Sequence, residues 1–154
     1  MRPRILIVGC IGFGNAGDEA IAAITAGHLC EAIPGAEITM LSGDPPHTEA
    51  AYGVRAVQWQ DPVAITEAVQ NTDLTILGGG GLFQDYWGFD PQTVLTREHW
   101  GLGFYTAPAF LSAVYGKPLM VYAAGVGRFA VQEKLLSPNR HFGAAYGVGG
   151  AHHR

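Results

Sequence analysis

Short apolar runs alternate with longer stretches of helical spacing along most of this chain. The runs rich in β-branched and aliphatic residues predict five strands, at Arg4–Val8, Glu37–Leu41, Arg55–Val57, Leu74–Leu77 and Leu119–Ala123. This alternation is typical of βαβ units and predicts an α/β protein with a parallel sheet and flanking helices. Right-handed connections would place the first strand near the centre of the sheet, with ligands at the carboxyl ends of the strands.

Helical spacing lies between the predicted strands. Pro62–Gln70 and Leu102–Tyr115 predict two crossover helices. A third precedes Pro34 and Gly35, which would end it. The apolar face expected for that third helix consists of Ile21, Ile24, Leu29 and Ala32.

The chain of 154 residues is 48% hydrophobic and 14% charged, as expected for one globular domain. Its net charge of −4 gives no basic surface for nucleic acid. Cys10 and Cys30 lack metal-ligand spacing, which favours reduced, buried thiols and no metal site. No apolar run approaches a signal sequence or a membrane span, so we expect a cytoplasmic protein.

The composition changes abruptly near Gln132, and glycine and histidine dominate the last residues. We therefore expect a domain at residues 1–136 and an aberrant, mobile tail at residues 137–154.

The first predicted strand leads into a loop that contains G-x-G-x-x-G at Gly12, Gly14 and Gly17. That motif suggests a nucleotide- or dinucleotide-binding domain. However, Asp18 and Glu19 stand at the helix start, where two carboxylates would repel a pyrophosphate.

The same loop suits a neutral, hydroxyl-rich ligand, since Asn15 both donates and accepts hydrogen bonds and the two carboxylates accept them from sugar hydroxyls. A purely structural interpretation remains open, in which Asp18 caps the helix and the glycines close a tight turn.

A second glycine-rich loop, Gly78–Gly81, is predicted after the fourth strand, and the pair Gly125 and Gly127 ends the fifth. Successive glycines let a ligand approach the backbone closely. The three segments would meet at one edge of the sheet. The predicted substrate-binding residues are Gly14, Asn15, Gly17, Asp18, Glu19, Gly79, Gly80, Gly81, Gln84, Asp85 and Gly125.

Aromatic residues crowd the stretch after the second glycine loop, where they can stack on sugar rings, pack in the core or cover an interface. They are Tyr86, Trp87, Phe89, Trp100, Phe104 and Tyr105. No histidine has a partner at a spacing that indicates catalysis, so the catalytic residues are unknown, and no cofactor is expected.

In these residues the chain resembles the polysaccharide pyruvyl transferase family. The matching elements are Gly12–Ala20, as G-x-G-N-x-G-D-E-A, Ile38–Ser42 with Asp44, Tyr52–Val54, Gly78–Asp85, Gly116–Pro118 and Tyr122–Gly127. The resemblance covers residues 4–127 and implies the Rossmann-like N-terminal half of a glycosyltransferase-B-like enzyme.

Such an enzyme would transfer the enolpyruvyl group of phosphoenolpyruvate to a sugar of a cell-surface glycan precursor, in cell-wall or exopolysaccharide biosynthesis. The resemblance implies that this half contacts a glycan acceptor, for which a lipid-linked form and peripheral contact with the inner membrane surface are expected. The family's arginines for phosphoenolpyruvate and its catalytic histidine belong to a C-terminal half.

No counterpart of that half follows here, so we expect a truncated product, or half of a split enzyme whose other half is a separate chain, inactive alone. The alternatives are a nucleotide- or dinucleotide-binding domain and a non-catalytic sugar-binding module.

Overall fold

A computed structural model describes residues 2–84, 88, 90–99 and 101–127 of the chain. Its strands are β1 (Arg4–Val8), β2 (Glu37–Ser42), β3 (Arg55–Gln58), β4 (Leu74–Phe83) and β5 (Leu119–Val126). Its helices are α1 (Ala16–Ala32), α2 (Pro45–Tyr52), α3 (Pro62–Gln70) and α4 (Leu102–Val114). The predicted tail at residues 137–154 lies outside the described residues.

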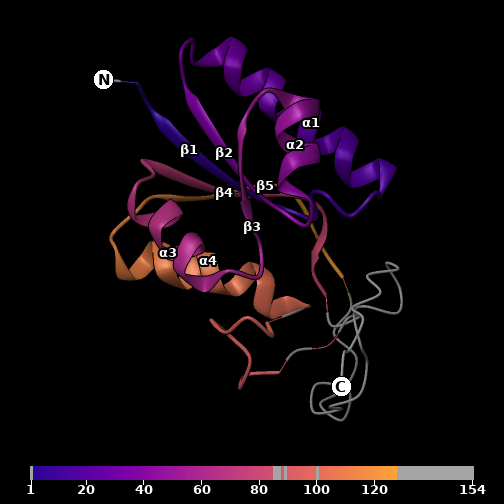
Figure 1. Cartoon of the computed structure of the whole chain (residues 1–154), viewed down its shortest axis with the longest axis vertical. Helices are drawn as coiled ribbons and strands as arrows, with labels where there is room; N and C mark the ends of the chain where they lie inside the picture. The colour runs from indigo at the N-terminus through magenta and orange to yellow at the C-terminus, as the bar shows by residue number, and fades with distance from the viewer. Residues whose placement is uncertain (1, 85–87, 89, 100, 128–154) are drawn as a thin grey trace.

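The five strands form one parallel sheet in the order β3-β2-β1-β4-β5, with β1 at its centre. Helices α1 and α2 cover one face, and α3 and α4 cover the other (Figure 1). The predicted α/β architecture is therefore confirmed, and the fold is Rossmann-like.

Alternation along β1 explains the three layers. Ile5 and Ile7 pack in the core beneath α1 and α2, whereas Leu6 and Val8 pack in the core beneath α3 and α4. Because successive side chains of a strand point to opposite faces, a central strand of a parallel sheet must be apolar at every position.

Helix α1 buries a face that matches the predicted one only in part. Its buried residues are Ala22, Thr25 and Ala26, and Leu29 packs against the core as predicted, while Ile24 is 56% exposed. The prediction was wrong for Ile24 because it followed the large apolar side chains. Small side chains let this helix approach the sheet closely, so the alanines and the threonine face the core.

Helix α2, which begins with Pro45 and Pro46, was not among the predicted elements. Asp44 caps this helix by accepting a hydrogen bond from the backbone N–H of His47, at 3.2 Å. Proline is well suited to the first helical turn, where its missing N–H is not needed. Asp61 caps α3 in the same way, before Pro62.

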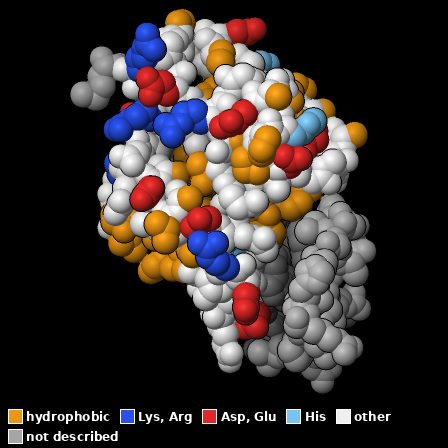
Figure 2. Space-filling view, in the orientation of Figure 1, with side chains coloured by type: hydrophobic (Ala, Val, Ile, Leu, Met, Phe, Trp, Pro, Cys, Tyr) orange, Lys and Arg blue, Asp and Glu red, His pale blue; other side chains and the backbone are white. Residues whose placement is uncertain are grey.

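The two edges of the sheet differ. β3 is short, and the side chain of Glu49 accepts a hydrogen bond from the backbone N–H of Ala56 at its outer edge, at 3.0 Å. β5 is twice as long, wholly uncharged and largely exposed on both faces. Hydrophobic atoms also gather over α4, at the lower left of Figure 2.

Candidate functional site

The candidate site lies at the point where the strand order reverses, beside the central strand β1. The chain leaves β1 toward β2 on one side, whereas β4 lies on the other side of β1. In open α/β sheets, ligands generally bind at the carboxyl ends of two such neighbouring strands, and we call this region at the ends of β1 and β4 the crevice. The backbones are close here, since a side chain at Gly9 would collide with the carbonyl oxygen of Gly78. Glycine residues therefore line both sides of this junction, Gly9 directly after β1 and Gly78 within β4.

Asn15, rather than Asp18, caps α1. Its Oδ1 accepts a hydrogen bond from the backbone N–H of Gly17, at 3.0 Å. Asn15, Gly14 and Gly17 are all exposed, and nothing lies within 4 Å of the position that a side chain at Gly14 would take. These three residues form an open rim.

Glu19 holds the loop in place. Its Oε1 accepts a hydrogen bond from the backbone N–H of Gly12, at 2.8 Å, and its Oε2 accepts one from the Tyr52 hydroxyl. This interaction and burial raise the pKa of Tyr52 to about 12, with burial the larger cause. Both carboxylate oxygens of Glu19 accept hydrogen bonds from the protein itself, so Glu19 positions the loop.

Asp18 is the partly buried carboxylate of the crevice. A side chain at Gly80 of β4 would collide with its Oδ1, so Asp18 lies directly against the backbone of that strand. Burial raises the pKa of Asp18, the charge of Glu19 adds to that shift, and a hydrogen bond from Cys10 opposes it. Asp18 thus joins α1 to the glycines of β4.

Cys10 lies between Asp18 and Tyr105. Burial raises the pKa of its thiol to about 12, the carboxylate of Asp18 adds to the shift, and a hydrogen bond from Tyr105 opposes it. Cys10 is therefore a neutral thiol near pH 7 and a poor nucleophile. Both cysteines are free as predicted, but neither is fully buried, since Cys10 is half-buried and Cys30 is exposed on α1.

The second glycine segment is not a loop. Gly78–Gly81 belong to β4, which continues to Phe83 and pairs with β5. The run from Gly78 to Gly81 resembled a loop because it lacks side chains. Gly79 and Gly80 have φ of 94° and 81°, and the pairing with β5 shifts register between Gly80 and Phe83. Gly79 is buried and Gly80 is half-buried, so within this irregular stretch only Gly81 exposes its backbone.

Gln84 lies beside the same strand end. An added Cβ at Gly81 would lie 3.1 Å from its Nε2, and one at Gly125 would lie 3.5 Å from the carbonyl oxygen of Gly80. The structure therefore brings together Asp18, Gly79, Gly80, Gly81, Gln84 and Gly125. Asp85 lies outside the described residues.

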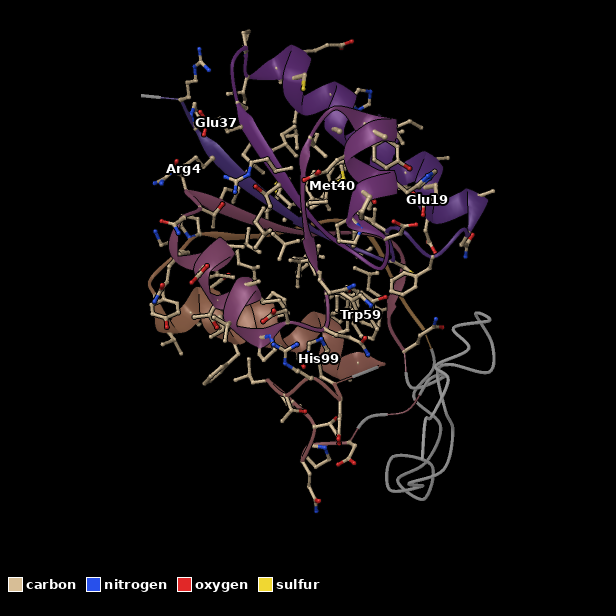
Figure 3. The ribbon with its side chains drawn as sticks, viewed as in Figure 1. Arg4, Glu19, Glu37, Met40, Trp59 and His99 are labelled. Atoms are coloured by element: carbon tan, nitrogen blue, oxygen red, sulfur yellow. The ribbon has the colours of Figure 1, made fainter. Side chains whose placement is uncertain are left out.

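An aromatic cluster supports the crevice from the side of α4. Trp59, directly after β3, makes edge contacts with Phe13, His99 and Phe104, at ring-centroid distances of 5.5, 5.3 and 5.1 Å. Figure 3 shows Trp59 and His99 side by side. Phe104 and Tyr105 pack in the core, whereas Tyr86, Trp87, Phe89 and Trp100 lie outside the described residues.

His99 is fully buried in this cluster, and neither ring nitrogen has a hydrogen-bond partner among the described residues. Burial lowers its pKa, and the backbone groups of Trp59 and Thr96 oppose that shift. An uncharged, packing role follows for His99.

Cys10 and Tyr52 were not predicted as site residues, and Tyr105 was named only as one of several aromatic residues that could stack or pack. Tyr52 is 33 positions from Glu19, and Tyr105 is brought to Cys10 by α4. The signal for Cys10 was its place directly after Gly9, at the end of the central strand.

A separate hollow of about 190 Å³ lies at the amino ends of the strands, away from the candidate site. Its lining includes Arg4, Glu37, Arg55 and Glu67. Figure 3 shows Arg4 and Glu37 at one end of the strands and Glu19 at the other. Arg4 pairs with Asp73 at 3.2 Å. The mixed charges of this hollow favour no particular class of ligand.

The described residues contain no group of three or more His, Cys, Asp or Glu side chains that could hold a metal ion. None of their helices has the length and apolar character needed to cross a bilayer.

In comparisons with known proteins, no family model matches this chain, and no curated protein matches it.

Proposed function

We propose that this chain is the acceptor-side domain of a polysaccharide pyruvyl transferase with a glycosyltransferase-B-like architecture. The observation that supports this most is the position of Asp18, a half-buried carboxylate held against Gly80 at the junction of β1 and β4. A half-buried carboxylate can accept hydrogen bonds from vicinal sugar hydroxyls.

The hydrogen bonds of the loop disfavour a pyrophosphate. The backbone N–H groups of Gly12 and Gly17 already donate to Glu19 and Asn15 of the protein itself. Dinucleotide sites leave such groups free for phosphate oxygens. Asp18 adds a negative charge at the same helix end, which supports a neutral ligand over a dinucleotide.

In the proposed reaction, two sugar hydroxyls form bonds to C2 of phosphoenolpyruvate. The methylene carbon gains a proton and becomes a methyl group, the hydroxyls lose their protons, and phosphate leaves. Asp18 would orient the sugar by accepting hydrogen bonds from its hydroxyls. The neutral Cys10 thiol would hold the Asp18 carboxylate in place.

Calorimetry on the purified chain tests the proposal, with a lipid-linked sugar precursor, phosphoenolpyruvate and NAD as separate ligands. We expect binding of the sugar precursor, and a loss of at least about tenfold in its affinity in Asp18→Asn, as for the loss of a charged hydrogen bond. Glu31→Gln, an exposed carboxylate farther along α1, is the matched control and should bind as the wild type does.

Tight binding of NAD without sugar binding would replace the proposal with a dinucleotide-binding domain. A separate assay follows pyruvate ketal formation from phosphoenolpyruvate and the sugar precursor. The chain alone should form none, because the described site contains no activated nucleophile or proton-transfer pair. Ketal formation by the chain alone would contradict the assignment to the acceptor side.

A further inference from the structure

Among the described residues, β5 is an edge strand, and apolar side chains on it and on α4 are exposed. Ten large hydrophobic side chains are exposed in the described part of the chain, and eight of them lie on α4, just after it, or on β5. We call these eight the β5 surface. They are Phe110, Val114, Tyr115, Leu119, Met120, Val121, Tyr122 and Val126.

The exposed area of the β5 surface is close to that of a standard interface. With exposed fractions between 38% and 74%, its eight side chains leave on the order of 700 Å² accessible, near the ~800 Å² that each partner buries in a standard interface. Because successive side chains of β5 point to opposite faces, this area is divided over both faces of the sheet edge, where it clusters beside α4.

The charge distribution allows a second copy to approach. Lys117 is the sole charged residue between residues 101 and 127, and its Nζ donates to the carbonyl oxygen of Thr72, at 3.0 Å. Two identical surfaces can therefore meet without repulsion between like charges, although the whole chain has a net charge of −4.

The two edges of the sheet are protected differently. Glu49 covers the outer edge of β3 through the N–H of Ala56, and Arg55 adds a charge there. Within the described residues, no side chain makes a comparable hydrogen bond to β5. Uncharged, uncovered edge strands readily pair with another strand.

We propose that β5 pairs with β5 of a second copy of this chain, antiparallel and about a twofold axis perpendicular to the sheet. Such a rotation keeps α4 of both copies on the same face. The exposed side of α4, with Phe110 and Val114 one helical turn apart, then packs against its counterpart beside the joined strands. This dimer goes beyond the proposed function and does not depend on it.

Sedimentation velocity of the full 16.3 kDa chain over a concentration series tests the proposal. We expect a reversible dimer for the wild type and a monomer for Val121→Lys, which places a charge in the middle of the edge strand. Val63→Lys is the matched control, because Val63 is 63% exposed on α3, outside the β5 surface. It should remain dimeric.

Hydrogen exchange of the β5 amides provides a second measurement. In the wild type their protection should increase with protein concentration, and in Val121→Lys it should not, while circular dichroism shows that the variant is folded. A wild type that stays monomeric, a Val121→Lys that still dimerises, or open-ended oligomers would each overturn the proposal.

Discussion

The Tyr52 hydroxyl donates a hydrogen bond to Oε2 of Glu19 at 2.5 Å, which joins the end of α2 to the first turn of α1. The same carboxylate accepts the backbone N–H of Gly12. One side chain therefore sets the position of the loop that leads from β1 into the candidate site. The shape of this loop depends on a helix that the sequence pattern did not predict.

Removing this link should cost stability. Tyr52→Phe is expected to lower the free energy of unfolding by about 1.5–3 kcal/mol, as for a hydrogen bond to a charged group. Urea denaturation of Tyr52→Phe, Glu19→Gln and the double variant measures the coupling between the two residues. Strictly additive effects would show that the hydroxyl and the carboxylate act independently.

Two loop glycines separate backbone strain from steric collision. Gly12 and Gly14 have φ of 78° and 75°. Gly14→Ala should cost about 1–2 kcal/mol, the strain of a left-handed residue. Gly12→Ala should cost clearly more, because its Cβ would lie 2.6 Å from the backbone nitrogen of Asp44 and would collide with Ser42. Equal costs in thermal or urea denaturation would mean that the loop yields freely around Gly12.

The ionised side chain of Asp18, which we place in the candidate site, should lower the stability of the folded protein. Because its pKa is raised in the folded state, its ionised form opposes folding, and this cost is complete above the folded pKa. Asp18→Asn should therefore stabilise the protein near pH 7, by no more than about 1 kcal/mol for a partly exposed group. The gain should shrink as the pH falls through the raised pKa. A variant that is less stable at neutral pH would contradict this.

His99 should make stability depend on pH in the opposite direction from Asp18, with stability lost as the pH falls. Its pKa is lowered from 6.5 in the folded state, so the unfolded chain binds a proton more readily. The contribution of His99 is retained above about pH 6.5 and is lost as the pH falls below that value. In His99→Phe, which keeps an aromatic ring beside Trp59, the loss of stability between pH 7 and pH 5 should be smaller. Parallel pH profiles for the two proteins would refute this role.

The sequence alone determined the order and type of most elements. The runs at Arg4–Val8 and Pro62–Gln70 have the bounds that the structure shows, because strand alternation and a proline at the helix start are local signals. The central position of β1 also followed from the sequence, since right-handed connections restrict how βαβ units can be arranged.

Local signals were insufficient where a neighbouring segment decides the conformation. Gly78–Gly81 extend β4 only because β5 lies alongside, and glycine on its own favours a loop. The buried face of α1 is set by how closely the helix can approach the sheet, which favoured Ala22 and Ala26 over Ile24.

For the candidate site, the sequence predicted the residue types and their position at the carboxyl ends of the strands. The tertiary structure distinguished their roles. Glu19 and Asp18 are adjacent in the sequence, but the partners that define them, Tyr52 and Gly80, come from α2 and β4. Contacts between such distant segments form only when the whole sheet is assembled, so no local pattern shows which carboxylate holds the loop and which one faces the crevice.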